Sequence, residues 1–537
     1  MKKRFTYSHL ILGTIILISI FGGAIVTYTT AKGPWGYTDP VEYISTARSL
    51  DNGLGFGYYG PSAVFVPITY HPPFYSIVLS ALGLFGINLI VGARWFNIIA
   101  FVMSIFISGW IFFRFSRVPA MGIIASALMC AFPYMVEMFS SAYSEPLFIL
   151  LFLSDGLCLF YYLDKEKPIF LLPSALLFGL IPVTRYIGIA MVIAAGLSIM
   201  FFSSEKPWLR GKKAALFVFV ASVPALFWLV RVYLSAFHSI AGRTIGLNWG
   251  ELAAKFQTFR GVFLDMVWEW VPFQSNETLL RYMVRLILTV IVAVVILALS
   301  LLAECRLHKD SAGETNKKDI QIFTFFGLSS LLFLAVLIVT YLIATPTLTM
   351  DNRMLLPFFV STLMTLFGGF ALWQSAWFKG GMRMLQILPW LIAVIGVVWY
   401  FPLAEDQVKA HHSGQSYTSY HWNQSELIQA VRILPPGKPV ISNEWELLLL
   451  WIGRPIHDFW DTFPSAPPIH LTMYGTDQRD HTQSIFCTEG AALVIFNDFP
   501  SDFRLFIGER YLNQLPNLFD GLTVYGVYPD GIIYLCP

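Results

Sequence analysis

Long apolar runs recur along most of this 537-residue chain, and they restrict its fold more than any other feature. A run of about 18 or more apolar residues is long enough for a helix to cross the hydrocarbon core of a membrane. Hydrophobic residues make up 56% of the chain and charged residues only 13%, which a water-soluble chain would have to bury almost entirely. We therefore expect an α-helical polytopic membrane protein.

Hydropathy predicts about eleven transmembrane helices. They lie near residues 9–29, 95–113, 119–136, 145–163, 169–183, 186–203, 214–234, 282–302, 321–344, 354–373 and 384–403.

Lysine and arginine predict one orientation for these spans, because short basic loops are retained on the cytoplasmic side. If the N-terminus is cytoplasmic, every second loop is an inner loop, and each of these is basic. They hold Arg114 and Arg117, then Lys165 and Lys167, then Lys206, Arg210, Lys212 and Lys213, then Arg306, Lys309, Lys317 and Lys318, then Lys379 and Arg383. The apolar segment 72–93 would invert all later loops if it spanned, so we expect a juxtamembrane or re-entrant helix on the outer side.

The predicted organisation is a transmembrane catalytic domain over 1–403, in which 30–93 form the first outer loop, followed by a small α/β domain over 404–537. Short β-like runs and a helical segment near 424–434 indicate the second domain. Pro529 to Gly531 lie between two apolar runs and predict a hairpin. Cys487 and Cys536 both fall there, where an oxidising compartment would permit a disulfide, although spacing alone leaves the pairing open.

The localisation that follows is a multi-pass protein of the plasma (inner) membrane. Its N-terminus would be cytoplasmic and its C-terminal domain periplasmic or extracellular. The net charge of +2 and the scattered basic clusters give no indication of nucleic-acid binding.

Charged residues near the predicted outer ends of spans are the candidates for chemistry, because a charge at membrane depth costs several kcal/mol. Carboxylates suit a general base or a metal or hydroxyl clamp, and arginines match phosphate oxygens. The predicted topology places all of them on one face of the membrane. They are Asp39, Glu42, Glu137, Glu145, Arg185, Arg231, Asp351 and Arg353.

Structural roles remain open for most of these residues. Asp39 precedes Pro40 and could cap a helix, and Glu145 precedes Pro146 at a possible helix start. The remaining alternatives are snorkelling to the interface for Arg185 and Arg231, an ordinary loop pair for Asp351 and Arg353, and a turn residue before two prolines for His71.

Several motifs occur in a fixed order. The first has the form (Y/W)xDPxxYxxxAxxLxxGxG after the first span, the second is HPPFY followed by Phe-Gly and an arginine, and shorter motifs lie further on. In this chain they are Tyr37, Asp39, Tyr43, Ala47, Leu50, Gly53 and Gly55, then His71 to Tyr75, Phe85, Gly86 and Arg94, then Ser144 and Glu145, Thr184 to Tyr186, and Asp351 to Pro357. With these motifs, residues 1–403 resemble the GT-C superfamily of integral-membrane glycosyltransferases, near the branch of the protein O-mannosyltransferases and the lipid A aminoarabinose transferase.

The resemblance implies a GT-C fold and an enzyme that moves a sugar, with inversion, from a polyprenyl-phosphate-linked donor to a glycan, lipid or protein acceptor at the outer membrane face. Asp39 would be the general base, and Arg185 and Arg353 would contact the lipid phosphate. The other implied substrate-binding residues are Glu42, His71, Arg94, Glu145, Tyr186 and Asp351. No cofactor is certain, a divalent metal is possible, and Glu145 is its possible ligand.

One departure weakens any assignment of mannose or of a protein acceptor. The protein O-mannosyltransferases carry adjacent Asp-Glu in the first motif, whereas this chain has Asp39 and Pro40 with Glu42 further on.

Two other classes of function compete. A transporter or flippase of lipid-linked sugars would typically show repeated halves with helices broken at the midplane, and the sequence has no such symmetry. A noncatalytic membrane scaffold would tolerate neutralisation of Asp39, whereas the enzyme would not.

Overall fold

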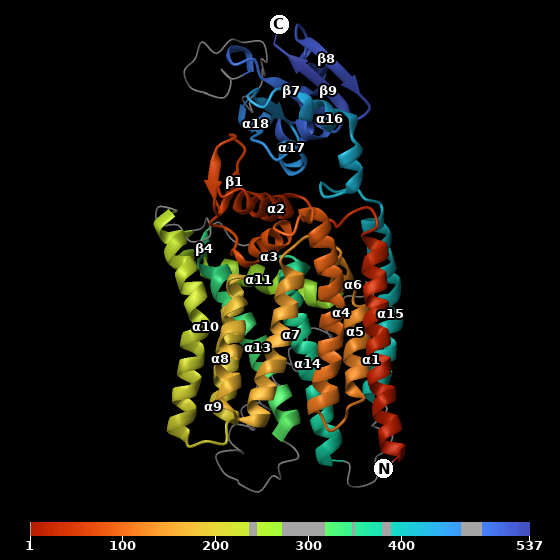
Figure 1. Cartoon of the computed structure of the whole chain (residues 1–537), viewed down its shortest axis with the longest axis vertical. Coiled ribbons are helices and arrows are strands. Elements are labelled where there is room, and N and C mark those ends of the chain that lie inside the picture. The colour runs from red at the N-terminus through yellow and green to blue at the C-terminus, as the bar shows by residue number, and fades with distance from the viewer. Residues whose placement is uncertain are drawn as a thin grey trace. The chain divides into compact units, whose positions relative to one another are not determined.

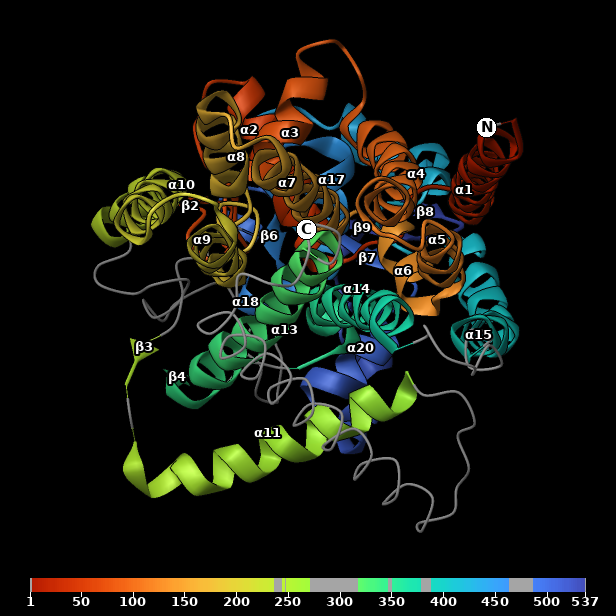
Figure 2. The same cartoon turned by 90° about the horizontal axis from the view of Figure 1, so that it is seen from below.

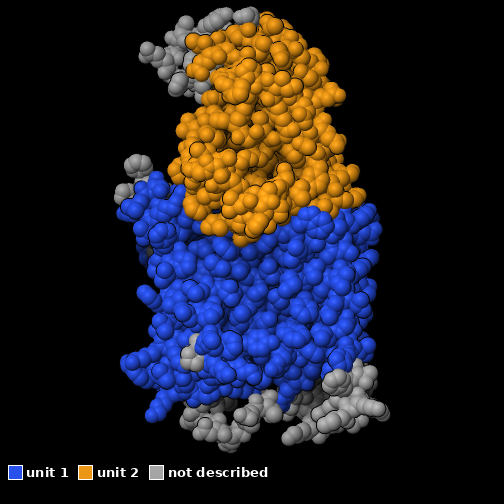
Figure 3. All heavy atoms as spheres, in the orientation of Figure 1, with its two compact units in different colours: residues 1–29, 69–75, 95–410 blue, residues 30–68, 76–94, 411–537 orange. Residues whose placement is uncertain are grey.

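The computed structural model describes residues 2–235, 244–246, 248–270, 317–345, 350–377, 388–462 and 486–536. Contacts divide the chain into two compact units (Figure 3). Unit 1 consists of Met1–Thr29, Thr69–Tyr75 and Trp95–Ala410. Unit 2 consists of Thr30–Ile68, Ser76–Arg94 and His411–Pro537. The prediction placed the first outer loop with the spans, whereas most of that loop clusters with the C-terminal residues.

Unit 1 is a helical bundle (Figure 1). Its helices are α1 (Lys2–Thr29), most of α4 (Leu89–Phe115), α5 (Met121–Ala131), α6 (Pro133–Phe139), α7 (Glu145–Lys165), α8 (Pro168–Leu180), the short η1 (Tyr186–Gly188), α9 (Ile189–Phe202), α10 (Pro207–Ser235), α11 (Trp249–Glu269), α13 (Lys317–Ile343), α14 (Asn352–Trp377) and most of α15 (Leu388–His412). Two-residue strands β3 (Thr244–Ile245) and β4 (Ala344–Thr345) pair antiparallel.

The predicted spans coincide with helices, apart from 282–302, which lies outside the described residues. Within the described residues, seven helices are long and apolar enough to cross a membrane, or up to eight when α5 and α6, bent by 65° at the break between them, are counted as one span. This is fewer than the predicted eleven because α8 and α9 are short and because 282–302 lies outside the described residues. Segment 72–93 does not form one span: α3 (Phe74–Gly83) ends in a turn, and α4 begins at Leu89.

Aromatic side chains fill the core of unit 1. Phe132, at the bend between α5 and α6, stacks on Phe359 of α14 with ring centroids 3.5 Å apart. Helix α11 lies along one edge of the bundle, crosswise to the other helices (Figure 2), and packs on α13 through the rings of Phe259 and Tyr341, whose centroids are 5.3 Å apart.

Basic and acidic residues meet at the C-terminal end of α7. Asp164 lies 2.6 Å from Lys318 Nζ and 3.8 Å from Arg114 Nη2. Nearby, Glu166 lies 3.8 Å from Lys317 Nζ, and the Glu166 carboxylate accepts hydrogen bonds from Ser204. The structure therefore brings several of the predicted inner loops to one end of the same helix.

Unit 2 contains a mixed five-stranded sheet in the order β6-β5-β7-β9-β8. Strands β5 (Val440–Ser442), β6 (His457–Asp458) and β7 (Ala492–Phe496) are parallel, and β9 (Gly531–Leu535) pairs antiparallel with β7 and with β8 (Thr523–Tyr528). The hairpin predicted at Pro529 to Gly531 is the β8–β9 turn, and Cys487 and Cys536 form a disulfide.

Alternation along the strands gives the sheet two buried faces. Val440 and Val494 pack with Leu427 and Leu447, which come from α16 (Glu426–Ile433) and α17 (Trp445–Ile452). The alternate residues of the same strands point to the other face of the sheet. There Ile441 and Leu493 pack in one cluster with Phe459 of α18 (Phe459–Thr462) and Phe503 of α20 (Phe499–Phe506).

The remaining elements of unit 2 come mainly from the first motif region. They are α2 (Thr38–Asp51), the antiparallel pair β1 (Gly57–Tyr59) and β2 (Phe65–Pro67), most of α3, and the 3-10 helices η3 (Tyr420–Gln424) and η4 (Glu509–Asn517). Helix α2 contacts α17, and the Arg48 guanidinium donates to the carbonyls of Leu449 and Leu450.

Candidate functional site

A buried carboxylate shared by two arginines lies at the N-terminal end of α7. Glu145 begins that helix, with Pro146 in its first turn, and its side chain is only 1% exposed. Glu145 Oε1 lies 2.5 Å from Arg185 Nη1 and 3.2 Å from Arg353 Nε. We call Glu145, Arg185 and Arg353 the Glu145 site. Since α7 has 21 residues, this site lies about 30 Å along the helix from Asp164.

Neighbouring side chains hold the two guanidinium groups in place. Arg353 lies over the ring of Tyr143 at 4.6 Å, and its Nε is 3.5 Å from Asp351 Oδ2. Arg185 Nη1 also donates to Ser144 Oγ at 3.4 Å. Asp351 also accepts a hydrogen bond from the Met354 amide. Its carboxylate therefore stabilises the loop before α14 as well as forming an ion pair with Arg353.

The two guanidinium groups are the part of the site that can bind an anion, and Glu145 and Asp351 together balance their charge. A buried carboxylate is stable only when it is paired, and two arginines pair with this one. Their side chains are 20% and 24% exposed, respectively. A planar guanidinium offers several N–H donors in a fork that matches phosphate oxygens. Because two positive groups already contact Glu145, a divalent cation at that carboxylate fits poorly, and we assign no chemical step to one.

The HPPFY segment is fixed to the turn that carries Arg185. The Phe74 amide donates to the carbonyl of Val183 at 2.9 Å. Tyr186 Oη donates to the carbonyl of Thr69 at 3.4 Å and accepts from Trp228 Nε1 at 3.0 Å. His71 lies within this segment, buried, with its ring edge-to-face to Tyr70 at 4.9 Å.

Asp39 lies in the first turn of α2, in unit 2. The helix begins at Thr38 after Tyr37, so Asp39 is not its N-cap residue, and its charge lies near the positive end of the helix dipole. Glu42, one turn further on, accepts a hydrogen bond from Tyr58 Oη at 2.9 Å.

Glu446 of α17 connects this helix to the sheet. Thr38 Oγ1 donates to Glu446 Oε2 at 3.0 Å. Burial raises the pKa of Glu446 to about 7, and the negative charges of Glu42, Asp458 and Asp39 act in the same direction. Asp39 therefore belongs to a carboxylate-rich region of unit 2.

Arg94 also lies in unit 2. Its Nε donates to Thr30 Oγ1 at 3.0 Å, and it hydrogen-bonds Tyr420. It thus joins three separate stretches of that unit. The structure brings together Glu145, Arg185, Arg353 and Asp351 in unit 1, and groups Asp39, Glu42 and Arg94 in unit 2.

Sequence reasoning missed Tyr143, Tyr58 and Glu446. Tyr143 directly precedes Ser144 and Glu145, so its position in a motif was a usable signal. Glu446 is the single acid in the apolar helix WELLLLWI, and a lone carboxylate in such a helix generally has a partner.

The architecture defines a class: a polytopic membrane protein with a GT-C-type fold, as the sequence resemblance predicted. The solved structures that it resembles include two of ArnT from Cupriavidus metallidurans. ArnT in the apo state matches 97% of this chain and 98% of its own, with a TM-score of 0.51 and 12% sequence identity. ArnT bound to undecaprenyl phosphate matches over the same shares and at the same identity, with a TM-score of 0.42. At this identity the likeness establishes the fold. No protein-family model and no curated protein matches the sequence.

Proposed function

We propose that this chain is an inverting glycosyltransferase that moves a sugar from a polyprenyl-phosphate-linked donor to an acceptor at the outer face of the membrane. The observation that carries the proposal is the Glu145 site. It offers two arginines, held by one buried carboxylate, at one end of an apolar helical bundle.

The Glu145 site suits the lipid phosphate of such a donor. Arg185 and Arg353 would bind the phosphate oxygens, while the apolar surface of unit 1 accommodates the polyprenyl tail. Glu145 orients both guanidinium groups before the donor binds, which reduces the entropy lost on binding.

Asp39 would supply the base. The acceptor hydroxyl gives its proton to the Asp39 carboxylate as its oxygen attacks the anomeric carbon. The bond between that carbon and the phosphate oxygen breaks, and the electron pair leaves with the lipid phosphate, whose charge the two arginines stabilise. A single displacement of this kind inverts the anomeric configuration.

Two further observations support the proposal. The likeness to the fold of apo ArnT extends over 97% of this chain, and this fold agrees with the one that the resemblance of the motifs to the GT-C family implies. The motif containing Asp39 and the motif containing Arg185 occur in the order typical of that family.

The experiment is an assay for release of free polyprenyl phosphate by the purified protein in detergent. A panel of polyprenyl-phosphate sugars serves as donors, and wild type is compared with Asp39→Asn. We expect one donor to be consumed by wild type, and the rate to fall by at least about a hundredfold in Asp39→Asn, the usual contribution of a general base.

Asp51→Asn is the matched control, because Asp51 is an exposed carboxylate at the other end of α2. It should turn over like wild type. Near-normal turnover of a folded Asp39→Asn protein would contradict the assignment of the base. No release from any donor, with or without candidate acceptors, would contradict the proposed enzyme class.

A further inference from the structure

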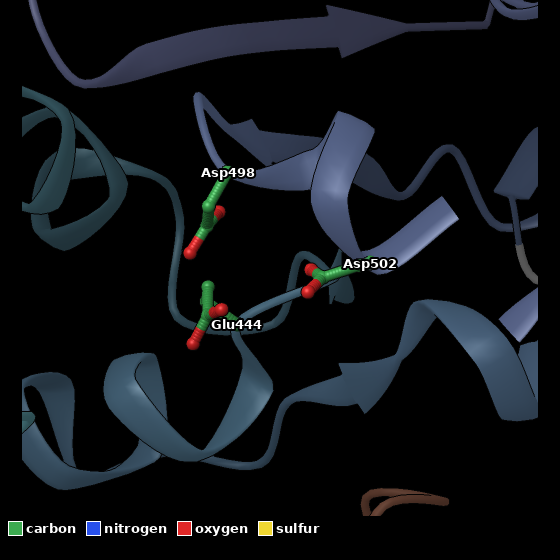
Figure 4. Close-up of side chains that lie close together, drawn as sticks. All are labelled: Glu444, Asp498 and Asp502. Atoms are coloured by element: carbon green, nitrogen blue, oxygen red, sulfur yellow. The ribbon is translucent and has the colours of Figure 1, made fainter. Parts of the chain in front are cut away.

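Three carboxylates converge in unit 2, outside the residues used above. Glu444 immediately precedes α17, Asp498 immediately precedes α20, and Asp502 lies in the first turn of α20. One oxygen from each lies within 4.8 Å of the others. Figure 4 shows the three side chains close together.

The position of this cluster in the sheet is informative. Strands β5 and β7 are parallel neighbours, with Ser442 opposite Val494. Glu444 and Asp498 each follow the carboxyl end of one of them, and in open α/β sheets this is the edge where ligands bind.

Glu444 is the most buried of the three carboxylates. The residue is only 7% exposed. Tyr417 and Asp498 hydrogen-bond to its carboxyl group, yet its buried Oε2 has no hydrogen-bond partner among the described residues. A buried, charged oxygen without a partner is strongly unfavourable. The two other carboxylates increase this cost, since none of the three forms an ion pair with a described lysine or arginine. Asp498 is exposed, which leaves a route from solvent.

A neighbouring amide orients the other two carboxylates. Asn443 Nδ2 donates to Asp498 Oδ1 at 3.1 Å and to Asp502 Oδ2 at 3.0 Å. Its Oδ1 accepts from the Phe496 amide at 2.9 Å, which fixes the Asn443 side chain. Fixed partners of this kind hold carboxylates for a metal ion and support its affinity.

We propose that Glu444, Asp498 and Asp502 bind one divalent cation of the oxygen-preferring type, Mg²⁺, Mn²⁺ or Ca²⁺. The cation ties the β5–α17 turn to the β7–α20 turn. It also fixes the start of α17, where Glu446 receives the hydrogen bond from Thr38 beside Asp39. The site is thus a structural support for the helix that carries Asp39, and it does not depend on the proposed sugar transfer.

The rival occupant is a proton. Burial and the nearby Asp498 raise the pKa of Glu444 to about 9, so a carboxyl group that shares a proton with Asp498 would also relieve the repulsion. Direct measurement of cation binding separates the two.

The experiment measures Mn²⁺ binding to the full-length protein in detergent, without donor, after removal of metals with EDTA. Free Mn²⁺ is followed by electron paramagnetic resonance. We expect one site in wild type, with affinity reduced about tenfold or more in Glu444→Gln and in Asp502→Asn. Excess Mg²⁺ or Ca²⁺ should compete for this site.

Matched controls are Glu426→Gln and Asp520→Asn, which remove exposed carboxylates of unit 2. Both should bind Mn²⁺ like wild type. If Glu444→Gln fails to fold, the half-buried Asp502 provides the decisive variant. No Mn²⁺ binding by wild type, or equal affinity in Asp502→Asn, would overturn the proposal and leave the shared proton as the occupant.

Discussion

Glu145 determines how the two arginines of its site are arranged. Long-range pairing of this kind was partly accessible to prediction, because the positive-inside pattern placed Glu145, Arg185 and Arg353 near the same ends of their spans. The atoms that form these ion pairs could not be predicted, because they depend on side-chain packing between α7, the turn before η1 and the start of α14. The contact between Thr38 and Glu446 was still less accessible, because nothing local in either segment specifies its partner.

A double-substitution test at this scale separates the structural and binding roles of Arg185. Arg185→Met leaves Glu145 with Arg353 alone and should destabilise the protein by up to about 3 kcal/mol, because a buried charge loses a partner. Adding Glu145→Gln should restore much of the thermal stability, measured in detergent. Donor affinity should remain weak in the double variant, because the guanidinium is still missing.

Arg210→Met is the control for that test, since Arg210 lies in the first turn of α10 and bonds the Glu205 carbonyl. It should leave donor affinity unchanged. Wild-type donor affinity in the double variant would show that Arg185 has no part in phosphate binding.

Among the elements, the strands of unit 2 follow most directly from sequence. Their β-branched runs and the Pro529–Gly531 turn identify β7, β8 and β9. One helix boundary differed from the prediction and one strand was not predicted, each for a physical reason. Helix α4 starts at Leu89, six residues before the predicted 95, because Asn88 accepts hydrogen bonds from the Ile90 and Val91 amides and starts the helix there. Strand β6 is only two residues long, too short for a periodic signal.

The end of β6 should make the stability of unit 2 depend on pH. Burial raises the pKa of Asp458 to about 7, with a further contribution from Asp461, whereas the unfolded chain has a pKa near 4. Between these values the folded state binds more protons. The stabilisation is complete below about pH 4 and is lost as the pH rises through about 7, by at most about 1.4 kcal/mol per pH unit.

Hydrogen exchange of the β5 and β7 amides, corrected for intrinsic rates, measures this dependence. Protection should fall between pH 5 and 7.5 in wild type and in Asp520→Asn, and the slope should be smaller in Asp458→Asn. An unchanged slope in Asp458→Asn would show that other groups cause the dependence.

At the scale of the whole molecule, hydropathy predicted a polytopic helical protein and the motif resemblance implied a GT-C fold, and the structure and its likeness to the fold of ArnT confirm both. The grouping of residues 30–68 and 76–94 with 411–537 was not predictable in the same way. It arises from contacts such as those of Arg48 with α17, which join parts of the chain far apart in sequence.

Orientation in the membrane can be tested with single cysteines and a membrane-impermeant maleimide applied to intact cells. Cys130, Cys158 and Cys305 are first replaced by alanine, and the Cys487–Cys536 disulfide is retained. Ser204→Cys, beside the basic end of α7, should be protected, and Glu426→Cys should be labelled. Both should react in permeabilised cells. The reverse pattern would contradict the predicted orientation.

Unit 2 is assembled from segments far apart in the sequence, and this affects the order in which it can fold during synthesis. Helix α2 emerges from the ribosome early, but Glu446, which binds Thr38, and the sheet that carries α17 are translated only after residues 95–410. A chain arrested after the last span could insert all its helices and still lack the partners of α2. The surroundings of Asp39 are therefore completed late in biosynthesis, after the last span has been translated.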